Sequence, residues 1–171
     1  MRWHPFQLNP DVPEGGVPRR AYIEQKFGAG AKRNYARIED IGKTLDIPFD
    51  FDAITVQPNT LQAHRLMAYG ERMGREDEVA EALFEAYFQK GEVLADIAVL
   101  ADIGARAGLD RASLEHYLAS DEDREAIAGA DLDARRAGIS GVPFFIFNGK
   151  VAVSGAQEPE ALLQAMEKAL E

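Results

Sequence analysis

The chain has 171 residues, no cysteine, and a formal net charge of −10 from 29 acidic and 19 basic side chains. Without cysteine, these residues form no disulfide bond or thiolate zinc site and supply no cysteine nucleophile. An acidic surface repels phosphate backbones, so we expect no nucleic-acid partner. The three histidines, His4, His64 and His116, lack the spacing of metal ligands, and we expect no metal site.

No segment has the roughly 20 consecutive apolar residues needed to cross a bilayer. Residues 1–5 do not resemble a signal peptide, because they lack an apolar core region. We therefore expect no membrane association and a cytoplasmic location.

Residues 2–8 predict a short strand in which Trp3, Phe6 and Leu8 are apolar. We expect Trp3 and Phe6 to pack in the core, and Pro5 favours an edge strand or a bulge. A loop rich in turn residues follows over residues 9–16. Pro18 then predicts the start of a helix that ends near residue 27.

The middle of the chain predicts a series of helices. Apolar side chains at helical spacing indicate a helix around residues 35–45, and residues 49–55 alternate weakly, as an extended segment would. Asn59 or Thr60 is suited to cap a helix that begins at residue 61. Further helices are predicted over residues 76–89, 96–107, 111–118 and 121–137.

The pattern changes near the C-terminus. Residues 142–147 form a continuous apolar run, as expected for a strand buried on both faces. Asn148-Gly149 is a strong hairpin signal and predicts a second strand over residues 151–154. A final helix with apolar positions at helical spacing follows from residue 159.

Four segments together resemble the DsbA-like family of thioredoxin-fold proteins: residues 3–10, residues 58–66, residues 138–145 and residues 153–157. The resemblance is to a bacterial branch of cytoplasmic polyketide-type DsbA oxidoreductases and 2-hydroxychromene-2-carboxylate isomerases. It implies an α/β protein with an incomplete thioredoxin-like fold and a large inserted all-helical domain. Residues 1–15 and 138–171 would form the thioredoxin-like domain, and residues 16–137 the helical insertion.

The resemblance also implies a substrate-binding site. Val142 would offer backbone hydrogen bonds to a bound peptide or glutathione, next to Pro143 in the cis form. Asn9 and Pro10 would lie at the substrate end of the sheet, although a plain Asn-Pro turn is an equal alternative.

Two further positions complete the predicted site. Ser154 and Gln157 belong to a Ser-Gly-Ala-Gln sequence that favours the oxidoreductase branch over the isomerase branch. His64 is a weak candidate for acid–base catalysis, because the alternative is a half-buried histidine bonded to backbone.

Relatives of this kind begin with a strand and a Cys-x-x-Cys helix, whereas this sequence begins at the second strand. We therefore expect the catalytic dithiol segment to be missing and these residues to be redox-inactive. We also expect a homodimer in which a second copy covers the exposed strand edges.

The leading hypothesis is a thiol-disulfide oxidoreductase of the DsbA family, acting on a cysteine-containing peptide or protein or on glutathione. One alternative is a glutathione-dependent isomerase or a relative of the kappa-class transferases. Another is a non-catalytic peptide-binding protein. No cofactor is expected, apart from glutathione as a possible substrate.

Overall fold

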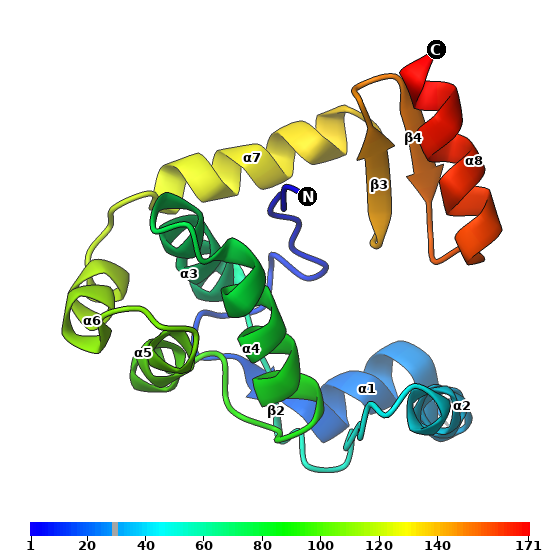
Figure 1. The fold of residues 1–171 in the computed structure, drawn as a ribbon. Helices are drawn as coiled ribbons and strands as arrows, with labels where there is room; N and C mark the ends of the chain where they lie inside the picture. The colour runs from blue at the N-terminus through cyan, green and yellow to red at the C-terminus, as the bar shows by residue number, and fades with distance from the viewer. Residues whose placement is uncertain (29–30) are drawn as a thin grey trace.

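The structure is a computed structural model that describes residues 1–28 and 31–171 (Figure 1). Within these residues the chain forms eight helices and four short strands. In chain order they are β1 (Val17–Pro18), α1 (Arg19–Phe27), α2 (Ala31–Thr44), β2 (Val56–Gln57), α3 (Leu61–Arg72), α4 (Glu76–Phe88), α5 (Ile97–Arg106), α6 (Arg111–Ala119), α7 (Arg124–Arg136), β3 (Phe144–Phe147), β4 (Val151–Ser154) and α8 (Pro159–Leu170).

The main hydrophobic core lies between α3, α4, α5 and α6. Apolar side chains at helical spacing on each helix point inward, and Leu66, Leu100, Ile103 and Leu114 are completely buried there. Gly104 lets α5 approach α6 closely, because a Cβ atom at this position would lie 2.1 Å from Leu114 Cδ2. The predicted helices over residues 76–89, 96–107, 111–118 and 121–137 are confirmed, with small shifts at their ends.

The predicted strand over residues 2–8 is wrong, since the segment has no regular secondary structure and pairs with no described strand. Its backbone bonds to side chains of α7 instead: the Gln7 N–H donates to Asp131 Oδ1 at 2.7 Å, and the Gln7 carbonyl accepts from Arg135. Trp3 packs on α4, where its ring lies 6.1 Å from that of Phe84. A strand needs a neighbouring strand for its hydrogen bonds, and here the neighbours are helices.

The α1 and α2 helices project from one side of the helical body (Figure 1). Pro18 directly precedes α1, as predicted. The expected extended segment over residues 49–55 has no strand pairing, and only Val56–Gln57 pairs, antiparallel, with Val17–Pro18. Aromatic stacking joins α2 to this segment, with the Tyr35 and Phe51 rings 4.7 Å apart.

The C-terminal hairpin is confirmed. Phe145 lies opposite Val153 and Phe147 opposite Val151, and two of the three residues between the strands, Asn148 and Gly149, have positive φ. The expected burial of residues 142–147 on both faces is wrong, because α8 packs on one face of the hairpin and Ile146 on the other face is 58% exposed.

The hairpin and α8 lie at the C-terminal end of α7, apart from the helical body (Figure 1). Among the described elements, β3, β4 and α8 contact one another and no other helix or strand. Residues 3–14 make their hydrogen bonds with the helical body, with α1 and with one another. The predicted domain formed by residues 1–15 with 138–171 remains a prediction.

Among the described residues, no helix is both long enough and apolar enough to cross a membrane.

Candidate functional site

The first candidate site is the start of β3, where the Val142–Pro143 peptide bond is cis. The Pro143 carbonyl accepts a 2.8 Å hydrogen bond from the Gly155 N–H, which ties this turn to the end of β4. Val142 is 50% exposed. The backbone N–H and carbonyl of Val142 bond to no other described residue. Both groups therefore remain available to a ligand that binds in an extended conformation.

Two more predicted residues lie beside this turn. Ser154 ends β4 opposite Phe144, and its carbonyl accepts a 3.1 Å hydrogen bond from Gln157 Nε2. Gly155, between them, has φ of +82°, a conformation that favours glycine. The structure therefore brings Val142, Pro143, Ser154 and Gln157 together at one end of the hairpin.

Asn9 and Pro10 belong to a second place on the molecule, a groove of about 590 Å³ between the loop after residue 8 and α1. Asn9 Oδ1 accepts hydrogen bonds from the Tyr22 hydroxyl and, at 2.8 Å, from Lys26 Nζ. No hydrogen bond or ion pair between described residues joins this groove to the hairpin turn. The six predicted binding residues thus form two separate groups.

His64 contacts the N-terminal segment from α3. Its Nε2 lies 3.2 Å from the Phe6 carbonyl, and a neutral ring that donates from Nε2 satisfies this contact. Burial lowers the pKa of His64, although the Phe6 carbonyl and Asp131 oppose the shift. His64 therefore has the arrangement that the sequence left as the alternative to acid–base catalysis, a histidine bonded to the backbone.

Two polar residues that anchor the N-terminal segment were not predicted. Asp131 and Arg135 on α7 form an ion pair of 3.0 Å, and together they bind both backbone groups of Gln7. The Arg135 guanidinium also lies 4.5 Å from the centre of the Phe6 ring. Their i, i+4 spacing on a helix was the signal in the sequence, but it is equally typical of an exposed pair.

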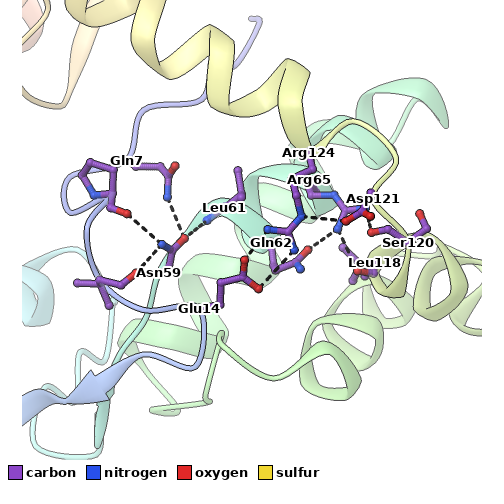
Figure 2. A network of polar contacts seen from close by, with 12 residues as sticks. Gln7, Glu14, Asn59, Leu61, Gln62, Arg65, Leu118, Ser120, Asp121 and Arg124 are labelled. Atoms are coloured by element: carbon purple, nitrogen blue, oxygen red, sulfur yellow. Dashed lines mark hydrogen bonds and ion pairs between the residues drawn. The ribbon is translucent and has the colours of Figure 1, made fainter.

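A polar network continues from this anchor into the helical body (Figure 2). Asn59 Oδ1 accepts from Gln7 Nε2 and from the Leu61 N–H, both at 2.9 Å. Thr60 is the N-cap residue of α3 and makes no side-chain cap bond, and the preceding Asn59 satisfies the first N–H of the helix. One turn further along α3, the completely buried Arg65 donates to Gln62 and to four backbone carbonyls at the end of α6: Tyr117, Leu118, Ser120 and Glu122. This network fixes the N-terminal segment and α6 to the same helix.

The described residues include no group of three or more His, Asp or Glu side chains placed to hold a metal ion. Burial and the Asp123 carboxylate raise the pKa of Tyr117 to about 12, so its hydroxyl stays protonated at neutral pH.

Residues 1–167 match the family described as a DsbA-like thioredoxin domain. The chain belongs to this family.

The DsbA-like chain is also similar to two individual proteins. It is 24% identical over 174 residues to the uncharacterized protein YwbO of Bacillus subtilis (strain 168), covering 97% of this chain and 80% of that protein. A crystal structure of a probable DsbA oxidoreductase from Streptomyces coelicolor superposes with a TM-score of 0.85, at 23% identity, covering 96% of this chain and 73% of the other. The thioredoxin-like fold of the DsbA type is thereby established, with a helix-rich mixture of α and β structure.

Proposed function

We propose that this chain is the substrate-binding part of a DsbA-type thiol-disulfide oxidoreductase. The supporting observation is the open turn at Val142 and Pro143, in a chain of the DsbA-like family. The Val142 backbone groups are unpaired among described residues, and the exposed Ser154 and Gln157 lie beside them. A cysteine-containing peptide, or glutathione, would bind there as an added extended segment.

These residues supply the binding half of the reaction and not the redox half. In disulfide exchange a thiolate attacks one sulfur of a disulfide, a mixed disulfide forms, and the other sulfur leaves as a thiolate. The 171 residues contain no thiol to form that intermediate. We therefore propose that this polypeptide by itself does not exchange disulfides.

An insulin-reduction assay with dithiothreitol tests the redox part of the proposal. The 171-residue polypeptide should leave the rate at that of dithiothreitol alone. A rate that rises with the concentration of the polypeptide would contradict the proposal.

Binding is tested with a cysteine-containing peptide that is acetylated at its N-terminus and amidated at its C-terminus. In the wild-type protein, nuclear magnetic resonance titration should shift the Val142 amide signal. Val142→Pro, which removes the N–H, should abolish binding, and Val142→Ala, which keeps it, should bind within about threefold of wild type. An unchanged Val142 signal at saturating peptide would refute this site.

We further propose that a second copy covers the apolar surface of the C-terminal unit. Leu163, Met166 and Leu170 on α8 are between 46% and 81% exposed, and Ile146, on the face of the hairpin that α8 does not cover, is 58% exposed. Large apolar side chains gathered on one helix are typical of an interface. β3 also has an edge that pairs with no described strand, and such edges are normally covered.

A further inference from the structure

The groove beside Asn9 has an apolar body with rigid walls. The apolar residues of its lining are Pro10, Val12, Pro13, Val17, Pro18 and Ala21, with Leu8. Proline fixes its own φ and has no N–H to satisfy, so this lining is both stiff and poor in backbone donors. Such a surface suits apolar side chains of an extended ligand.

Two polar side chains of the groove lining, Asn9 and Tyr22, bind Lys26, which lies beside the groove. Lys26 Nζ donates to Asn9 Oδ1 at 2.8 Å and to the Tyr22 hydroxyl at 2.7 Å, and the Tyr22 hydroxyl in turn donates to Asn9 Oδ1. Tyr22 and Lys26 are four residues apart, on the same face of α1. The three side chains form a closed triangle, with the ammonium group 5.2 Å from the centre of the Tyr22 ring.

Lys26 and Asn9 have hydrogen-bond donors for which this triangle contains no acceptor. The Lys26 ammonium has three N–H donors and uses two of them here, and the Asn9 amide NH₂ has no partner among the described residues. The Asn9 oxygen already accepts two hydrogen bonds. No carboxylate lies within 4.0 Å of Lys26 in the described part of the chain. The triangle is therefore cationic, with spare donors.

We infer that this groove is a subsite for a peptide whose apolar residues lie along the proline-lined walls and whose carboxylate binds Lys26 and Asn9. A carboxylate has two acceptor oxygens and one negative charge, which match the spare donors and the cation. The carboxylate is either the C-terminus of the peptide or an aspartate or glutamate side chain. The inference rests on the proposed function, because it takes the bound peptide to be the substrate.

Asp11 allows a second test, in which the affinity should change in the opposite direction to that at Lys26. It lines the same groove, and a fixed negative charge there opposes an anionic ligand. Removing the charge at Lys26 and removing the charge at Asp11 should therefore change the affinity in opposite directions.

Three probe peptides separate the sources of the carboxylate: N-acetyl-Leu-Val-Ala with a free C-terminus, the same peptide as its amide, and N-acetyl-Leu-Val-Asp amide. Titration calorimetry or nuclear magnetic resonance measures each Kd. We expect at least one of the two carboxylate peptides to bind roughly three- to tenfold more tightly than the alanine amide. The carboxylate peptide that binds more tightly shows whether the groove prefers a C-terminal carboxylate or an aspartate side chain.

The variants then assign the preference to the triangle. Lys26→Met should remove the preference for carboxylate and leave the affinity for the alanine amide unchanged, whereas Asp11→Asn should strengthen binding of the carboxylate peptide. Lys43→Met, at an exposed lysine of α2 paired with Asp40, is the matched control and should behave as wild type. Equal Kd values for all three peptides, no measurable binding of any, or a preference that survives Lys26→Met would each overturn the inference.

Different peptides test the subsite beside Lys26 and the hairpin site at Val142, so each proposal can fail without the other. The cysteine peptide that tests Val142 is blocked at both ends and has no carboxylate, so its binding does not depend on Lys26. Loss of the carboxylate preference alone refutes the subsite, and an unchanged Val142 signal refutes the hairpin site.

Discussion

The carboxylate of Asp131 accepts a 2.7 Å hydrogen bond from the backbone N–H of Gln7, which precedes it by 124 residues in the chain. The Asp131 side chain is buried and also pairs with Arg135. This contact holds the N-terminal segment against α7 and so fixes the start of the loop that contains Asn9.

Asp131→Ala should lower the free energy of unfolding by about 2–4 kcal/mol, because it leaves the Arg135 cation and the Gln7 N–H without their partner. Urea denaturation measures this value. Asp133→Ala is the control on the same helix: its ion pair with Arg136 is exposed, and the expected loss is under about 0.5 kcal/mol. Equal losses in the two variants would contradict the assignment of Asp131 as an anchor.

Arg65→Met should lower the free energy of unfolding by about 3–5 kcal/mol. The substitution preserves much of the side-chain volume but leaves the carbonyls at the end of α6 without donors in a buried place. Arg111→Met, which removes an exposed arginine bonded to Asp102 and Glu115, should have a much smaller effect. A mild effect at Arg65 would show that water replaces its contacts.

His64 should make stability fall as the solution becomes acidic. Its pKa in the folded protein lies below the ordinary value of 6.5, so the unfolded chain binds the proton more readily. The contribution is complete above about pH 6.5 and is lost as pH falls from there through the lower folded-state pKa.

His64→Gln should therefore lose less stability than wild type between about pH 7.5 and pH 5, measured by urea denaturation at each pH. His116→Gln removes an exposed histidine and serves as the control. If wild type and His64→Gln show parallel pH profiles, burial does not lower the pKa of His64 in the folded protein.

The proposed dimer should dissociate when charge is placed on its apolar surface. Met166→Glu or Ile146→Glu should change the mass measured by light scattering from that of a dimer to that of a monomer, without changing the circular dichroism spectrum. Leu132→Glu, at an exposed position of α7, should remain dimeric. A wild-type protein that is monomeric at high concentration would rule out the interface.

Much of the fold follows from local sequence patterns. The Asn148-Gly149 turn, the pairing of residues 144–147 with 151–154 and the helices of the core depend on neighbours in sequence, and these predictions were confirmed. The strand predicted over residues 2–8 failed, because alternation of apolar residues does not reveal whether a second strand is available to pair with them.

The two candidate sites also differ in whether their contacts depend on residues that are close in sequence. The resemblance to the DsbA-like family assigned Val142, Pro143, Ser154 and Gln157 to the site, and they lie close together because they belong to one hairpin and its flanks. The contact of Asn9 with Tyr22 and Lys26 depends on how a loop folds back on α1, and neither lysine nor tyrosine stands out in an ordinary helix. Asp131 was hidden for the same reason, since its partner Gln7 lies at the other end of the chain.

The separation of β3, β4 and α8 from the helical body has a consequence for cooperativity. Because these elements contact only one another among the described elements, opening the hairpin disturbs no helix of the core. Backbone amides of the hairpin should therefore exchange with deuterated water through a local opening of low free energy. Amides of α3–α6 should exchange only when the whole helical body unfolds. The chain would thus unfold in two stages, with the proposed Val142 site in the less stable one.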